Sequence, residues 1–380
     1  MLYRKFGKTN EMVSALGFGC MRLPTIDNDY SKIDEEKALH LIRYAIDSGV
    51  NYVDTAYPYH GTGMDRGGNS ELFVAKALKN GYRSKVKIAT KLPSWLIKNR
   101  QDMDRYLNEQ LKRLETESID FYLVHGLNSA LWQPLKEAGI FGFLDQALKD
   151  GRIKHAGFSF HDTFDLFKQI VDDYDWSFCL IQYNYVDEDA QAGIRGLKYA
   201  FEKDLGIAIM EPLRGGKLAK VPASVQNVFN QGEVKRPPFE WALKWLWNQP
   251  EISVVLSGMN EMEQLQENMR IASETEANSL KVKELEMFKQ ARTTYRKELK
   301  IGCTGCGYCM PCPNGVDIPS CFNIFNNYHM FGPAEGGFYR MLKMYGQEAS
   351  NCLECGICEE HCPQSIAIPE ELKNVAALFE

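Results

Sequence analysis

Residues 86–91 read VKIATK, and residues 119–125 read IDFYLVH. The middle of each stretch is apolar at consecutive positions, whereas a strand with one face in water alternates apolar and polar residues. Burial on both faces is typical of a parallel sheet that helices cover. The two stretches therefore predict strands inside an α/β fold.

Short apolar runs alternate with longer amphipathic runs over most of the chain. The expected strands lie near 15–20, 51–55, 86–91, 119–125, 153–159, 178–184, 206–212 and 252–257. The expected helices lie near 35–48, 70–80, 102–115, 135–149, 163–173, 190–203, 236–248 and 261–272. Eight strand–helix units of this length fit a (β/α)8 TIM barrel. A doubly wound sheet is the alternative, but no G-x-G-x-x-G follows the first strand.

Two cysteine runs follow this pattern near the C-terminus. The first has cysteines at 303, 306, 309 and 312, the second at 352, 355, 358 and 362, and proline follows the last cysteine of each. A C-x2-C-x2-C run can bind three irons of a cubane, while the cysteine before proline usually binds the other cluster of a pair. We therefore expect two [4Fe–4S] clusters, one on Cys303, Cys306, Cys309 and Cys362 and the other on Cys352, Cys355, Cys358 and Cys312. The first run has a shorter spacer before Cys312, so Cys321 is an alternative ligand there.

A zinc site and a disulfide framework are the other interpretations of these cysteines. Zinc sites typically pair two C-x2-C units, so a triple run that ends in Cys-Pro exceeds what zinc requires. Disulfides occur mainly in exported proteins, and the N-terminus MLYRKFG lacks the apolar region of a signal peptide. We expect a cytoplasmic protein with metal-bound thiolates and no membrane-spanning helix. The net charge of −6 argues against a general nucleic-acid binder.

The pattern divides the chain into two expected domains. Residues 3–6 and 13–15 flank GKTN at 7–10, which predicts a small hairpin that caps the bottom of the barrel. Residues 280–299 form one more predicted helix, rich in Lys and Glu. We expect the barrel domain to cover residues 1–299, and a small, mainly α-helical, ferredoxin-like iron–sulfur domain to cover residues 300–380.

Three of the expected strands end in an ionisable residue. These residues are Asp54, Lys91 and His125. In a barrel the carboxyl ends of the strands form the catalytic mouth, so we expect the three side chains to meet there. Tyr59 lies in the loop after Asp54 and can join them. Each residue alone has a structural explanation, but three on successive strands indicate a site.

The four side chains suit the reduction of a carbonyl group. This reaction needs a proton donor beside the oxygen that becomes an alkoxide. A tyrosine hydroxyl has a reference pKa of about 10, which an adjacent Lys91 ammonium would lower. Asp54 would keep Lys91 charged, and His125 would hydrogen-bond the substrate oxygen and orient it.

The motif DTAYPY at 54–59, with Lys91 and His125 at matching distances, resembles the aldo-keto reductase family. The segments AIDSGVNY at 45–52 and GFG at 17–19 resemble the same family. The whole chain is similar to the bacterial and archaeal branch that carries a C-terminal ferredoxin-type domain. The resemblance implies a (β/α)8 barrel and NAD(P)H-dependent carbonyl reduction. The family roles fall on Tyr59 as general acid, Lys91 and Asp54 as its partners, and His125 as the orienting residue.

The resemblance also implies where NADP or NAD would bind. Ser159 and Gln182 match residues that hold the nicotinamide carboxamide, and Glu267 and Asn268 match the pair that grips the adenine. Leu213, Arg214, Gly215 and Gly216 lie in the loop after the seventh strand, which would cover the pyrophosphate. Arg214 is the natural phosphate partner, with a solvated surface arginine as the alternative.

Three positions depart from the family pattern. Met210 stands where many relatives stack an aromatic ring on the nicotinamide, and Phe160 stands where an asparagine usually follows Ser159. Residues 258–260 read GMN and lack the basic residue that pairs with the 2′-phosphate of NADP. The choice between NADP and NAD therefore stays open.

The two halves of the chain predict different electron chemistry. A nicotinamide delivers two electrons as hydride, whereas a [4Fe–4S] cluster passes one at a time, so direct coupling needs a converter such as a flavin. The clusters would therefore be structural, or would exchange electrons with a docked ferredoxin or flavoprotein, unless the barrel performs unusual electron chemistry. We expect an oxidoreductase that acts on a small carbonyl or alcohol substrate. The alternative is an iron–sulfur electron-transfer protein whose barrel binds a partner or ligand.

Overall fold

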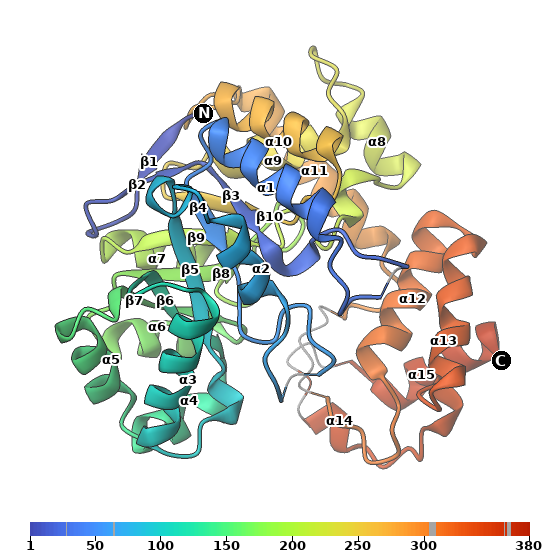
Figure 1. Ribbon diagram of the computed structural model, residues 1–380. Coiled ribbons are helices and arrows are strands. Elements are labelled where there is room, and N and C mark those ends of the chain that lie inside the picture. The colour runs from blue at the N-terminus through green and yellow to red at the C-terminus, as the bar shows by residue number, and fades with distance from the viewer. Residues whose placement is uncertain (28, 64, 304–308, 361, 363–365) are drawn as a thin grey trace. The chain divides into compact units, whose positions relative to one another are not determined.

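A computed structural model describes residues 1–27, 29–63, 65–303, 309–360, 362 and 366–380. Within this part of the chain, eight strands form a closed barrel in the order β10-β3-β4-β5-β6-β7-β8-β9 (Figure 1). All neighbouring strands of the barrel pair in parallel. The strands are β3 (Leu16–Gly19), β4 (Tyr52–Asp54), β5 (Lys87–Leu92), β6 (Ile119–Leu127), β7 (Ile153–Phe160), β8 (Phe178–Gln182), β9 (Gly206–Met210) and β10 (Val254–Ser257). The predicted TIM barrel is confirmed.

Amphipathic helices follow the barrel strands along the chain. In α1 the buried residues Ala38, Leu41, Ile42 and Ala45 recur every three or four positions, which gives the helix one apolar face. The helices of the barrel are α1 (Glu35–Asp47), α2 (Ser70–Ala77), α3 (Arg100–Arg113), α4 (Ser129–Glu137), α5 (Ile140–Lys149), α6 (Phe164–Asp173), α7 (Gly193–Glu202), α9 (Pro238–Trp247) and α10 (Met262–Glu274).

The connection between β6 and β7 differs from the prediction. The single helix expected at 135–149 is wrong, because two helices, α4 and α5, occupy this segment. Gly139 separates them with a φ of 84°, a left-handed conformation that breaks the helical hydrogen-bond ladder and that glycine adopts without strain. The first helix, α4, begins at Ser129, N-terminal to the expected start at residue 135, and it contains Pro134.

The predicted hairpin forms and closes one end of the barrel. Its strands, β1 (Tyr3–Lys5) and β2 (Met12–Ser14), pair antiparallel. Phe6 is fully buried in the cluster of side chains inside the barrel, with its ring centroid 4.9 Å from that of Phe121. A Cβ at Gly206 would lie 2.6 Å from the Phe6 ring, so a glycine is needed where this ring enters.

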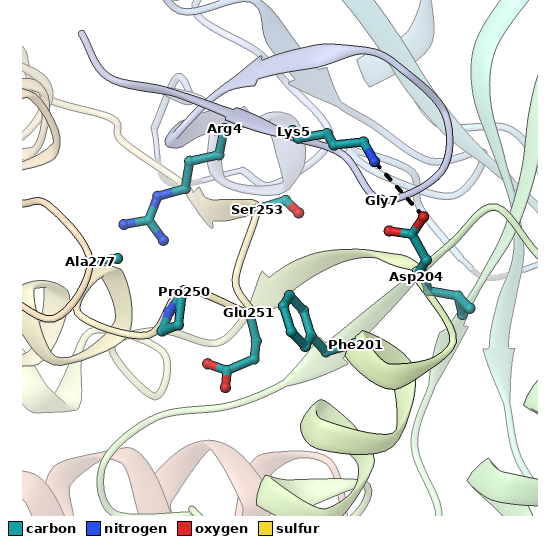
Figure 2. Close-up of a pocket in the computed structure, with 10 residues that line it drawn as sticks. Arg4, Lys5, Gly7, Phe201, Asp204, Pro250, Glu251, Ser253 and Ala277 are labelled. Carbon is teal, nitrogen blue, oxygen red and sulfur yellow. Dashed lines mark ion pairs between the residues drawn. The ribbon is translucent and has the colours of Figure 1, made fainter.

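A cavity of about 310 Å³ lies beside this hairpin (Figure 2). Leu205 and Ser253, which line it, directly precede β9 and β10, so it opens at the amino ends of the strands. Arg4 donates to the carbonyl groups of Ile252 (2.8 Å) and Gln249 (3.0 Å) beside it. The cavity therefore lies at the opposite end of the barrel from the carboxyl strand ends.

The chain divides into two compact units. The first contains Met1–Ala219 and Phe239–Lys281, and the second contains Lys220–Pro238 and Val282–Glu380. In the second unit α8 packs against α11, and α12 packs against α11, α13 and α15. Its helices are α8 (Ala223–Phe229), α11 (Val282–Glu298), α12 (Ile318–Phe331), α13 (Tyr339–Met344), α14 (Ile357–Glu360) and α15 (Ile368–Phe379). The expected domain boundary at residue 299 stays a prediction.

A small apolar core holds the C-terminal part of this second unit together. Phe322, Phe325 and Tyr339 are buried in it, together with Leu372 and Val375. None of the described helices is both long enough and apolar enough to span a lipid bilayer.

Candidate active site

Asp54 and Lys91 meet at the carboxyl end of the barrel. Asp54 ends β4, and Lys91 lies near the end of the neighbouring strand β5. The Lys91 Nζ donates to both carboxylate oxygens of Asp54, at 2.7 and 2.9 Å, and to the carbonyl oxygen of Thr55 at 2.7 Å. Lys91 is 1% exposed and Asp54 is 4% exposed. The predicted strand-end pair is therefore a buried, fully hydrogen-bonded ion pair.

Tyr59 and His125 lie beside this pair. The Lys91 Nζ is 4.9 Å from the centre of the Tyr59 ring. The ring centroids of Tyr59 and His125 are 6.1 Å apart, with the ring planes nearly perpendicular. Trp95 adds a third ring, 5.1 Å from that of His125. The structure thus brings the four predicted catalytic side chains together, with an indole as a neighbour.

Burial and the ion pair set the protonation of Lys91 and Tyr59. Although burial disfavours the ammonium, Asp54 and Tyr59 raise the pKa of Lys91 above its ordinary value, so Lys91 stays charged. Burial also raises the pKa of Tyr59, and the Lys91 ammonium opposes that shift. The net shift of the Tyr59 pKa is therefore upward, whereas Lys91 alone was expected to lower it. The cost of burying the phenolate away from water is larger than its stabilisation by Lys91, because the charge of Lys91 is partly neutralised by Asp54.

His125 is held as a neutral imidazole. Burial, the positive charge of Lys91 and the proximity of His161 lower its pKa well below the ordinary histidine value. Its Nδ1 atom is buried and has no hydrogen-bond partner among the residues that the structure describes. A neutral imidazole carries one N–H donor, so His125 can donate to an oxygen atom bound beside Tyr59.

Ser159 and Gln182, the residues expected to hold a nicotinamide, lie at adjacent strand ends. Ser159 is 1% exposed on β7, and its Oγ accepts a hydrogen bond from the Gly126 amide at 2.7 Å. Gln182 ends β8, and its Oε1 accepts from the Gln191 side chain at 3.3 Å. The hydroxyl of Ser159 keeps its own proton for donation to a ligand.

The expected phosphate loop follows β9 and contains Leu213. Arg214, Gly215 and Gly216 have φ values of 50°, 69° and 96°, which turn this segment sharply. The Arg214 Nε donates to the Asp187 carboxylate at 3.0 Å. The guanidinium is therefore held by a carboxylate, and its side chain is 17% exposed, unlike the solvated surface arginine of the alternative interpretation.

The expected adenine pair lies on α10. The Glu267 carboxylate accepts from Arg270 at 2.9 Å, and the Asn268 Nδ2 donates to the Ser257 Oγ at 3.2 Å. Asn268 is 5% exposed, so this contact links the helix to the end of β10. The predicted cofactor residues thus follow one another from β7 to α10, each with a contact inside the protein.

The predicted cluster ligands lie in the second unit. Six of them pack against its apolar core, and these are Cys303, Cys309, Cys312, Cys352, Cys358 and Cys362. The thiol of Cys352 accepts a hydrogen bond from the Glu354 amide at 3.4 Å. Cys355 is exposed, and Cys306 lies outside the described residues. Within the described ranges, no three acidic, histidine or cysteine side chains form a preassembled metal site.

Comparison with known families identifies the barrel. Residues 15–289 match the model of the aldo/keto reductase family. The chain belongs to this family. Residues 302–367 of this aldo/keto reductase match the 4Fe-4S dicluster domain. The predicted combination of an aldo-keto reductase barrel with an iron–sulfur domain is confirmed, and the protein is an oxidoreductase.

Individual relatives support the same identification. This aldo/keto reductase is 27% identical over 318 residues to the uncharacterized oxidoreductase YqkF of Bacillus subtilis (strain 168). The match covers 75% of this chain and 96% of YqkF. It is 35% identical over 164 residues to "Probable aldo-keto reductase 1" of Glycine max, over 41% of this chain and 44% of that protein. The holo form of aldo-keto reductase AKR11C1 from Bacillus halodurans superposes with a TM-score of 0.63 at 23% identity, over 77% of this chain and 96% of that chain.

Sequence reasoning missed a set of buried polar residues behind the tetrad of this aldo/keto reductase. Glu71 and Gln110 are fully buried, although both residue types usually face water. A signal for Gln110 was present, because it continues the helical stripe of Met103, Tyr106 and Leu107 on α3. A polar residue on an apolar stripe indicates a buried hydrogen-bond network.

Proposed function

We propose that this aldo/keto reductase reduces the carbonyl group of a small molecule, or oxidises the corresponding alcohol, with NADH or NADPH. The observation that carries the proposal is the buried Asp54–Lys91 pair beside the ring of Tyr59. A buried ammonium that is held charged next to a phenol can stabilise the phenolate left after proton transfer. A neutral His125 packs against Tyr59, with its ring centroid 6.1 Å from that of Tyr59, and adds a hydrogen-bond donor to the site.

When it is bound, the nicotinamide supplies the hydride that reduces the carbonyl carbon. Tyr59 donates its hydroxyl proton to the carbonyl oxygen, so that the substrate gains one hydride and one proton and Tyr59 becomes a phenolate. Lys91 stabilises that phenolate, and Asp54 keeps Lys91 charged. His125 donates a hydrogen bond to the same oxygen and fixes its position. In alcohol oxidation the Tyr59 phenolate accepts the proton.

Two features of α10 and its preceding loop favour NADH over NADPH. Residues 258–260 lack a basic side chain, as the sequence shows. Arg270, which lies near Glu267 on the same helix, is already bonded to three carboxylates, those of Glu240 at 2.7 Å, Glu267 at 2.9 Å and Glu274 at 3.0 Å. A 2′-phosphate would have to displace these carboxylates, whereas a 2′-hydroxyl would not.

Tyr59→Phe tests the proposed reductase directly. Removal of a general acid typically costs about 10²- to 10⁴-fold in rate, so we expect kcat to fall by at least about 100-fold while nucleotide binding is kept. Tyr82→Phe is the matched control, because the Tyr82 hydroxyl bonds to Asp47 at 2.7 Å and Tyr82 precedes the amino end of β5, away from the tetrad. The measurement is anaerobic nucleotide titration followed by a panel of carbonyl substrates. A protein that binds no nucleotide, or a Tyr59→Phe variant with unchanged turnover, would contradict the proposal.

For the iron–sulfur domain we propose two [4Fe–4S] clusters with the crossed ligand sets expected from the sequence. Cys303, Cys306, Cys309 and Cys362 would hold one, and Cys352, Cys355, Cys358 and Cys312 the other. The choice of Cys312 over Cys321 rests on burial. Cys321 is 0% exposed inside α12 and its thiol points to the Gln347 carbonyl at 3.8 Å, and burial raises the pKa of Cys321 to about 12. Cys312 is only partly buried.

We further propose that the clusters exchange single electrons with a separate ferredoxin or flavoprotein. Leu353 and Ile357 lie between ligand cysteines and are 71% and 47% exposed, and apolar side chains of this kind suit transient docking. About eight irons per chain would support two clusters, and reversible one-electron reduction would support electron exchange. Zinc in place of iron would refute the proposal, and clusters that resist reduction would leave them a structural role.

A further inference from the structure

A buried carboxylate lies behind the tetrad, outside the barrel. Glu71, in the first turn of α2, is 0% exposed. Its Oε1 accepts from the Thr90 hydroxyl at 2.7 Å and from the Gln110 Nε2 at 2.8 Å, and its Oε2 accepts from the Arg113 Nε at 2.8 Å. One carboxylate thus joins α2, β5 and α3.

The first arm of this cluster reaches the backbone of Lys91. Successive side chains of a strand point to opposite faces, so Thr90 faces the helices while Lys91 faces the barrel interior. The Gln110 Nε2 also donates to the Lys91 carbonyl oxygen at 3.0 Å, and the Gln110 Oε1 accepts from the Tyr122 hydroxyl at 2.7 Å. Glu71 and Gln110 therefore fix the end of β5 from its outer face.

The second arm reaches the backbone of Tyr59. Arg113, bound to Glu71, also donates to the carbonyl oxygen of Gly68. A Cβ at Gly68 would lie only 2.1 Å from the Tyr59 carbonyl oxygen, so Gly68 rests directly on that backbone. The Ser70 amide, next to Glu71, donates to the same oxygen at 3.1 Å.

We propose that Glu71 is a positioning residue, which holds the strand that carries Lys91 and the loop that carries Tyr59 in one fixed geometry. The inference rests on the proposed reductase function, because it assigns Glu71 a part in keeping the proton donor beside its ammonium. Three donors converge on Glu71, and only a carboxylate can accept from all of them. A glutamine there would turn an NH₂ group toward at least one of these donors.

Loss of this geometry would act on the acidity of Tyr59. The charged and titratable groups that face Tyr59 are Asp54, Lys91, Tyr30 and His125. Of these, the Lys91 ammonium is the one that lowers the pKa of Tyr59. A looser loop would move the phenol away from the ammonium and would also admit water. Because burial is the largest cause of the raised pKa of Tyr59, the net effect would be a fall of that pKa toward its ordinary value.

Glu71→Gln tests the proposal against Asp120→Asn. Asp120 is a comparably buried carboxylate, which accepts from Lys154 at 2.6 Å, from Arg83 at 2.8 Å and from the Ile88 amide at 2.9 Å. It lies at the start of β6, at the opposite end of the barrel from the tetrad. The two variants should therefore lose similar amounts of thermal stability, and only the Glu71 variant should change the chemistry.

We expect Glu71→Gln to lower kcat about tenfold with little change in KM, because a small misplacement of reacting groups affects the transition state most. We expect the alkaline limb of the reduction profile to move to lower pH. The same shift should be seen without turnover, in the 13Cζ resonance of Tyr59 during a pH titration of labelled protein, with Tyr59→Phe identifying the signal.

Unchanged kcat and unchanged Tyr59 titration in Glu71→Gln would overturn the proposal, and so would equal effects in Asp120→Asn. If Glu71→Gln does not fold, Arg113→Lys replaces it, because the compact ammonium lacks the forked geometry in which two guanidinium nitrogens of Arg113 reach Glu71 and Gly68 separately. An unchanged Tyr59 titration in that variant would also overturn the proposal. Wild-type protein without carbonyl reductase activity would count against the proposed function alone, since the Tyr59 resonance still reports on positioning.

Discussion

Asp54→Asn separates the two roles of the buried ion pair. In the wild type the Lys91 ammonium has three acceptors within 2.9 Å, and two of them belong to Asp54. The substitution removes the countercharge of a group that is 1% exposed. Breaking a buried pair by removing one partner typically costs about 3 to 5 kcal/mol. We expect about 3 kcal/mol here, because the Thr55 carbonyl still accepts from Lys91.

The same substitution should abolish most of the chemistry. Without Asp54 the pKa of Lys91 falls, since burial disfavours its charge, and a neutral amine cannot stabilise the Tyr59 phenolate. We expect kcat for carbonyl reduction to fall by about 100-fold. The assays are urea denaturation for the free energy of unfolding and steady-state kinetics for turnover. A typical domain stability of about 5–15 kcal/mol leaves enough margin for the variant to fold.

The double variant Asp54→Asn/Lys91→Met is the control for this reasoning. Once the ammonium is also removed, no uncompensated charge is buried, so most of the lost stability should return while the enzyme stays inactive. The reasoning is refuted if Asp54→Asn is as stable as the wild type. It is refuted equally if the double variant remains as unstable as the single one.

Three further outcomes follow from the same contacts. Because the pKa of Tyr59 is raised, the rate of carbonyl reduction should decline only above about pH 10, and the rate of alcohol oxidation should increase over that range. A kcat/KM profile in which reduction already declines below about pH 9 would contradict this. The pKa of His125 is depressed in the folded state, so the unfolded chain binds more protons and the free energy of unfolding should fall as the pH drops below about 6.5. In urea denaturation at several pH values, His125→Gln should show a weaker dependence of stability on pH, and an equal dependence in both proteins would contradict this. Iron analysis should show about half the iron in Cys312→Ala and full iron in Cys321→Ala, and the reverse order would exchange their roles.

The barrel and the convergence of the tetrad were predictable, because both depend on local sequence. The runs at 86–91 and 119–125 correspond to β5 and β6 within a few residues, since strands buried on both faces have an uninterrupted apolar pattern. Parallel strands place their carboxyl ends at one rim, so Asp54 and Lys91 had to approach each other. Their direct contact follows from the neighbouring positions of β4 and β5.

The remaining features depend on tertiary distances that no local pattern encodes. The pairing of Arg214 with Asp187 joins side chains 27 positions apart. The break at Gly139 depends on one left-handed residue inside a pattern that reads as a single helix. The sign of the Tyr59 pKa shift depends on two opposing effects, the cost of burial and the charge of the Lys91 ammonium. The cost of burial is known only from the packed structure.

The raised pKa of Tyr59 also bears on the separate roles of the barrel and the iron–sulfur domain. A phenol that keeps its proton at neutral pH is a ready donor for the carbonyl reduction that we propose. Reduction of this kind is complete once one hydride and one proton have moved, and it leaves no single electron over. In the reaction that we propose, the iron–sulfur domain therefore performs no step inside the barrel. The partner that we propose for it is a carrier that accepts or donates electrons singly, which is why we assign the exposed apolar side chains beside its cysteines to protein docking.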